Sequence, residues 1–83
     1  MKKGIIKARL EIVENTNIVE EAFYKLGIKI IKAESCLFSG TITYYCHCDK
    51  FEDNMHGEKI HEYAIIVTEN EDKKRDFKLN IAN

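Results

Sequence analysis

Residues 28–48 read IKIIKAESCLFSGTITYYCHC, and the fold prediction starts from this stretch. Two strand-like runs, 28–38 and 41–48, are separated by Ser39 and Gly40, as in a hairpin with a two-residue loop. In that register one face is mostly apolar and pairs Leu37 with Ile42, Ser35 with Tyr44, Ala33 with Cys46 and Ile31 with Cys48. The other face is mixed polar and pairs Glu34 with Tyr45, Lys32 with His47 and Cys36 with Thr43. The stretch therefore predicts an antiparallel hairpin with one buried and one exposed face.

Two elements are predicted before the hairpin. Alternation of apolar and polar residues over 6–12 predicts a strand, and a helical pattern through Ile6, Leu10 and Val13 remains as the alternative. Asn17 stands three residues before Glu20, as in a capping box, and a helical apolar stripe and Gly27 follow. The pattern predicts a helix over residues 17–26, with Ile28 closing against Phe23.

Two strands are predicted after the hairpin. The polar segment 49–59 predicts the longest loop, and Ile60 to Thr68 predicts a central strand with both faces partly covered. The charged turn 69–75 leads to a last strand in which Phe77, Leu79 and Ile81 alternate with polar residues.

The element order β-α-β-β-β-β over residues 1–83 predicts a single small α+β domain. We expect an antiparallel sheet of four to five strands with one helix packed on one face, because this arrangement buries the most apolar surface. The predicted core consists of Val19, Phe23, Leu26, Leu37, Ile42, Tyr44, Ile65, Leu79 and Ile81.

Composition excludes several classes of protein. The 83 residues are 45% hydrophobic and 33% charged, which suits a folded domain better than a disordered chain. Thirteen basic residues against fourteen acidic ones disfavour direct nucleic-acid binding. The apolar runs are too short for a membrane span or a signal peptide, and three cysteines suit a reducing compartment, so we expect a cytoplasmic protein. The abundance of Ile, Lys and Asn suggests a low-GC bacterium, a phage or another mobile element as the source.

Two cysteines and two histidines are the only plausible metal ligands: Cys46, Cys48, His56 and His61. Their side chains suit tetrahedral zinc, but cysteines two residues apart on a strand lack the usual spacing of a zinc site. The simpler interpretation is that Cys46 and Cys48 are small core residues. We expect no bound metal and no cofactor.

No catalytic arrangement is predicted. A thiol nucleophile needs a neighbouring histidine, and the pairs Cys36 with His47 and Cys46 with His56 are not brought together by the predicted register. The acidic loop lacks the ligand spacing of a calcium-binding hand, so a solvated loop is the simpler interpretation.

Charge is unevenly distributed along the chain. Residues 1–33 carry seven basic and four acidic side chains, residues 34–72 carry two and nine, and residues 73–83 carry four and one. The acidic block favours a non-enzymatic inhibitory or regulatory module that docks on the basic surface of a protein partner. The predicted contact residues are Tyr45, Asp49, Phe51, Glu52, Asp53, Met55, Glu58, Glu69, Glu71 and Asp72.

Two further classes of function stay open. A small-ligand or nucleotide-binding dimer would bind anions in a pocket lined by Tyr44, Tyr45, Tyr63, Lys7 and Arg9. A zinc-stabilised module or thiol enzyme is the third class. We also expect a homo-oligomer, most simply a dimer, because so small a domain leaves a sheet face or edge incompletely covered; Phe38, Tyr45 and the last strand are candidate contacts.

Overall fold

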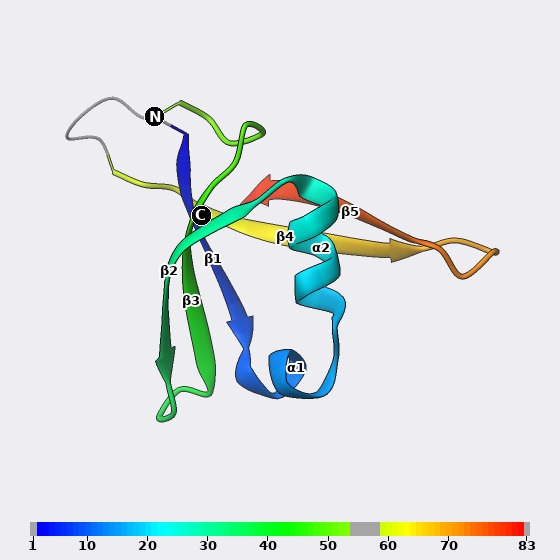
Figure 1. The fold of residues 1–83 in the computed structure, drawn as a ribbon, viewed down its shortest axis with the longest axis horizontal. Coiled ribbons are helices and arrows are strands. Elements are labelled where there is room, and N and C mark those ends of the chain that lie inside the picture. Colours follow the sequence, from blue (N-terminus) through cyan, green and yellow to red (C-terminus); the bar gives the residue numbers. More distant parts are fainter. Residues whose placement is uncertain (1, 54–58, 83) are drawn as a thin grey trace.

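The computed structural model describes residues 2–53 and 59–82 and shows one five-stranded sheet with two short helices (Figure 1). The elements are β1 (Lys3–Arg9), α1 (Leu10–Asn15), α2 (Ile18–Leu26), β2 (Lys29–Cys36), β3 (Thr41–His47), β4 (Glu62–Glu69) and β5 (Arg75–Ile81). The predicted small α+β domain is therefore confirmed as a class. One further helix, α1, was not predicted.

The sheet is mixed, so the predicted purely antiparallel sheet is wrong. The strand order is β2-β3-β1-β4-β5, and β1 pairs antiparallel with β3 but parallel with β4. After β3 the chain passes the start of β1, where Cys48 N–H donates to the Lys2 carbonyl and Ile5 N–H donates to the His61 carbonyl. The chain thus reaches the free side of β1 and runs along it in the same direction.

The first strand ends earlier than the alternation predicts. β1 stops at Arg9 and the chain turns into α1, so a strand extending to residue 12 is wrong. The alternative helical spacing of Leu10 and Val13 describes this segment better. Thr16 closes α1, since both its N–H and its hydroxyl donate to the Ile12 carbonyl.

Helix α2 follows the prediction closely. It begins after Asn17, but the Asn17 side chain makes no capping hydrogen bond, so the expected capping box does not form. Gly27 adopts φ 69°, and the next N–H, of Ile28, donates to the Phe23 carbonyl at 2.9 Å, which closes the helix as predicted. Ala22, Phe23 and Leu26 form the buried side of the helix.

The hairpin forms in a register that differs from the prediction. Ala33 faces Tyr44 and Ser35 faces Ile42, a shift of two residues, and a bulge at Ile31 shifts the pairing beyond it. The loop is longer because β2 ends at Cys36 and residues 37–40 form the turn. Because side chains alternate with period two, the two-residue shift leaves residues 32–36 on the predicted faces.

The core lies between α2 and one face of the sheet. Phe23 meets Tyr44 edge-on at 5.0 Å between ring centroids, and Phe51 stacks on Tyr63 at 4.3 Å. Most predicted core residues are buried or packed against this cluster. Two are exposed and were wrongly predicted: Leu37 lies in the turn, and Ile81 lies near the end of β5.

The opposite face of the sheet has no described element packed on it (Figure 1). It carries Lys7, Thr43, Tyr45, Lys32 and Glu34, which the strand pairings place on one side. The interior strand β4 is therefore covered on one face, not on both as predicted, and Ile66 on its other face is 40% exposed.

Candidate functional site

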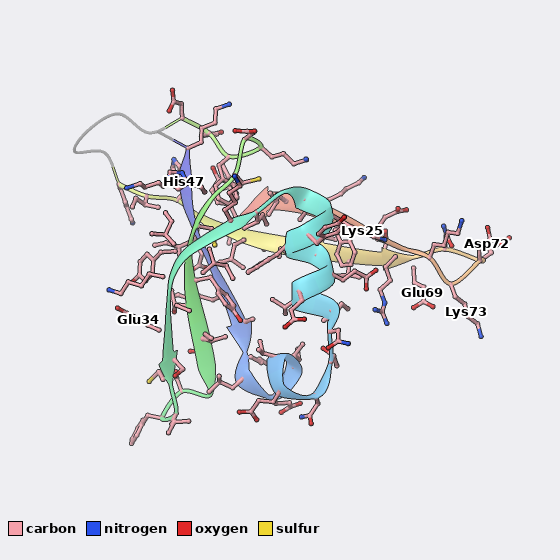
Figure 2. The ribbon with its side chains drawn as sticks, in the orientation of Figure 1. Lys25, Glu34, His47, Glu69, Asp72 and Lys73 are labelled. Carbon is pink, nitrogen blue, oxygen red and sulfur yellow. The ribbon has the colours of Figure 1, made fainter. Side chains whose placement is uncertain are left out.

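The predicted acidic docking surface is divided between two ends of the molecule. Asp49, Glu52 and Asp53 lie in the connection after β3, near the N-terminus (Figure 1). Figure 2 shows Glu69, Asp72 and Lys73 at the far tip of the β4–β5 hairpin, where Glu71 also lies. Glu58 lies outside the described residues. The acidic block in the sequence is thus not one acidic surface in the described structure.

The tip of the β4–β5 hairpin is also balanced in charge. Lys73, Lys74 and Arg75 follow its three acidic residues directly. The Asn70 side chain organises this turn, because its oxygen accepts hydrogen bonds from the N–H groups of Asp72 and Lys74. The acidic and basic charges at the tip of the β4–β5 hairpin therefore nearly cancel, and the tip is not an acidic surface.

The predicted apolar anchors have different environments. Tyr45 is half-buried on the open sheet face, with the Lys32 ammonium 5.5 Å from its ring centroid. Phe51 is buried in the core and cannot serve as a surface anchor, which corrects the prediction. Met55 lies outside the described residues.

The cysteines and histidines are not gathered into a metal site in the described part of the chain, where no group of three or more metal-ligating side chains occurs. Cys46 and Cys48 are buried in the core, and the Cys48 thiol donates to the Leu26 carbonyl at 3.3 Å. His61 lies 3.8 Å from a Glu52 oxygen, and His56 is outside the described residues. These positions fit the interpretation of the two cysteines as core residues.

The thiols lie in different environments. Burial, with the neighbouring Cys48, raises the pKa of the Cys46 thiol to about 11, which keeps it protonated at neutral pH. Hydrogen bonds from Ser39 and from the Phe38 backbone lower the pKa of the exposed Cys36 thiol. Cys36 lies at the opposite end of the β2–β3 hairpin from His47, so they do not form the considered nucleophile pair.

The residues of the alternative anion pocket lie on opposite faces of the sheet. Tyr44 and Tyr63 are buried on the helix side, where burial raises the pKa of Tyr44, whereas Tyr45 and Lys7 lie on the open side. A groove of about 370 Å³ does exist between the helices and the sheet, but its lining is mainly aliphatic, including Ile12, Val19, Ile65 and Val67. Lys7 and Arg9 of the predicted pocket line this groove, but Tyr44, Tyr45 and Tyr63 do not.

The largest group of exposed apolar side chains lies elsewhere, on β2 and the turn after it. Of the nine large apolar side chains exposed in the described residues, four belong to this segment. Phe38 is 103% and Leu37 is 87% exposed, and Ile30 and Ile31 are about half exposed, at 51% and 52%. We call β2 together with residues 37–40 the β2 edge, since β2 is the outermost strand on its side of the described sheet.

The β2 edge also has unpaired backbone groups and a charged pair of side chains, in the part of the chain that the structure describes. The outer side of β2 has no strand paired to it in the described chain, and such an edge is a template for pairing with another strand. Lys32 and Glu34 lie on one face and form an ion pair at 2.7 Å, and hydrogen bonding to Glu34 raises the pKa of Lys32. Figure 2 shows Glu34 beside β2 at this side of the molecule.

Sequence reasoning found only part of this site. It predicted Phe38 as a candidate contact, but it placed Leu37 in the core and Ile31 on the buried face of the hairpin. The missed signal is the length of the loop, because a four-residue turn ends β2 before Leu37. The twin isoleucines Ile30 and Ile31 also interrupt the alternation, as a bulge requires.

Comparison with known proteins adds no relative. No family model, curated protein or solved structure matches the chain. In the described residues, no helix has both the length and the apolar character that crossing a membrane requires.

Proposed function

We propose that the chain is a non-enzymatic protein-binding module and that the β2 edge is its binding element. The observation that carries this proposal is the exposure of Ile30, Ile31, Leu37 and Phe38 on the outermost strand and its turn. Large apolar side chains exposed along one edge of a small domain are typical of a protein interface. Burial of a leucine or phenylalanine side chain contributes roughly 1.5–3 kcal/mol, so the turn alone is a strong anchor.

The mode of binding follows from the same geometry. A strand of the partner that pairs with β2 satisfies the outer backbone groups, and the exposed side chains supply contacts on either side. The regular part of the edge is short, because the bulge at Ile31 limits it on one side and the turn limits it on the other. We therefore expect the apolar side chains to supply most of the affinity and the backbone to supply the orientation.

The experiment compares capture of proteins from a low-GC bacterial lysate by three forms of the chain. The variant Leu37→Ser with Phe38→Ser removes the anchor, and we expect it to lose the captured protein. Tyr24→Ser is the matched control, because Tyr24 is 88% exposed on α2, away from β2. Capture that survives the turn variant, or that is lost equally in the Tyr24 control, contradicts the proposal.

A fourth form tests the acidic docking hypothesis directly. Glu52→Lys with Asp53→Lys reverses two charges in the connection after β3 and leaves the β2 edge unchanged. We expect this form to capture the same protein as the original chain. Loss of capture here, with retention in the turn variant, would transfer the binding site to the acidic loop.

A further inference from the structure

We infer that the partner of the β2 edge is a second copy of this chain, paired antiparallel about a two-fold axis at Ala33. This inference rests on the proposed function and names the partner. In this register Lys32 of each copy lies opposite Glu34 of the other, so the axis generates two identical cross-strand charge pairs. Together with the ion pair inside each chain, the four charges alternate in sign across the junction.

Other symmetric registers lack this complementarity. If the axis shifts to Lys32, the two Lys32 ammonium groups face each other. If it shifts to Glu34, the two Glu34 carboxylates face each other. Like charges that face each other across strands are destabilising. A one-residue slip sets a charged side chain against Ala33. The charge pattern therefore selects the axis at Ala33, whose small side chain allows a close approach.

The apolar side chains are self-complementary in the same register. The antiparallel ladder runs toward the Ile30–Ile31 bulge of one copy and the Cys36 end of the other, so the turn with Leu37 and Phe38 lies near the bulge of the second copy. This contact occurs twice because of the two-fold axis. The four exposed apolar side chains of the β2 edge are thus covered in the dimer by the β2 edge of the second copy.

β5, the outermost strand on the other side of the described sheet, is less suited to pairing with a second copy. β5 also has alternating charges, with Asp76 and Lys78 on either side of Phe77. However, Phe77 and Leu79 are packed against the core, and Arg75 is bound to Glu21 at 3.0 Å. Pairing through β5 therefore buries little additional apolar surface. Pairing through β2 joins two five-stranded sheets with all helices on one side and both open faces on the other.

The first experiment measures the dimer dissociation constant by sedimentation equilibrium, under reducing conditions because Cys36 is exposed. Lys32→Glu and Glu34→Lys each create two like-charge pairs, and we expect each to weaken the dimer by about tenfold or more, which corresponds to ~1.4 kcal/mol. The double variant Lys32→Glu with Glu34→Lys restores opposite charges and should recover the original affinity. An equimolar mixture of the two single variants should form a mixed dimer.

Three controls keep the result specific. Lys32 and Glu34 are exposed and both single variants lose the same internal ion pair, so thermal unfolding should show little change in either monomer. Asp76→Lys and Lys78→Glu apply the same charge changes to β5 and should leave the dimer unchanged. Dissociation by the β5 variants, or equal weakening by the single and double β2 variants, overturns the inference.

The second experiment locates the axis. At an axis on Ala33 only that position faces its own copy, so Ala33→Cys in a Cys36→Ser background should form an intermolecular disulfide under mild oxidation. Ser35→Cys in the same background lies two residues from the axis, beside the bulge of the other copy, and should form much less. Preferential cross-linking through Ser35→Cys contradicts the register.

The outcomes also separate this inference from the proposed function. A chain that stays monomeric at every concentration, yet captures another protein through Leu37 and Phe38, refutes self-pairing and keeps the protein-binding role. A monomeric chain whose capture does not depend on the turn refutes both. A dimer that responds to the β2 charge variants as described supports both.

Discussion

Gly4 is the position where one added methyl group tests the core most directly. A Cβ atom at Gly4 would lie 2.7 Å from Cδ2 of Tyr63 and 2.8 Å from Cε2 of Phe51. These two rings stack at 4.3 Å with an angle of 17° between their planes, so neither can yield without disturbing the other. Gly4→Ala therefore forces the stack to move.

The expected cost of Gly4→Ala is that of an overpacked core. Such changes cost roughly 1–3 kcal/mol, and we expect ~2 kcal/mol because both neighbours are ring atoms of buried side chains. For a domain of this size, this lowers the midpoint of thermal unfolding by roughly 8–16 °C. Urea unfolding followed by far-UV circular dichroism measures the change in the free energy of unfolding directly.

A double-mutant cycle identifies the cause. Phe51→Leu removes the ring edge that faces Gly4, so Gly4→Ala should cost less in that background, with a coupling free energy of about 0.5–3 kcal/mol. Costs that add to within ~0.5 kcal/mol mean that the Phe51 ring does not lie over Gly4. That result would refute the packing of residues 48–53 on the core described here.

Three further predictions concern single side chains. Tyr63→Phe removes the hydroxyl oxygen that accepts the Glu52 N–H at 2.9 Å; we expect a loss of about 1 kcal/mol and faster hydrogen exchange at Glu52, and unchanged exchange contradicts this contact. With a thiol-specific reagent at pH 7, Cys36 should react first and Cys46 only on unfolding, and Ser39→Ala should slow Cys36; equal rates for both thiols would count against these environments. Desolvation acts to raise the pKa of Glu21, but the hydrogen bonds from Lys25 and Arg75 lower it overall, so its stabilisation is present above the ordinary value of 4.5 and is lost as pH falls through the lowered value. Glu21→Gln should therefore unfold more easily at pH 7 and match the original chain in strong acid, and a difference that persists in acid argues against this origin.

Local patterns in the sequence predicted the elements well where one physical requirement dominated. The spacing of Ala22, Phe23 and Leu26 requires a helix to bury all three, and Gly27 supplies the left-handed residue that ends it. The pairing of β2 with β3 was predicted with the correct faces but a register two residues away. Face is determined by alternation, whereas register depends on turn length, which Ser39 and Gly40 did not reveal.

Long-range pairing could not be predicted in the same way. The direction of β4 relative to β1 depends on the connection that follows β3, and the polar composition of residues 49–59 contains no signal for it. The crossing is held by contacts that become visible only in three dimensions, such as the Tyr63 hydroxyl with Glu52 and the Phe51 ring over Gly4. Phe51 therefore looked like a surface anchor in a polar loop but is a core residue.

The same distinction explains why the acidic block misled the functional prediction. Net charge counted along the chain assumes that sequence neighbours share a surface, but the length of β4 separates Glu62 at its start from Glu69 at its end and from Asp72 in the turn that follows. Charge that determines pairing acts at the scale of single residues on one strand, as with Lys32 and Glu34 on either side of Ala33. In a sheet protein, strand pairing at an outer strand depends on the order of charges along that strand, because each residue of a second strand faces one residue of the first. The double charge exchange at Lys32 and Glu34 keeps the net charge of the chain unchanged, whereas each single variant changes it by two units, as Asp76→Lys and Lys78→Glu also do. Loss of the dimer in the single β2 variants, but not in the β5 variants, would therefore show that the order of charges on β2, and not total charge, controls association.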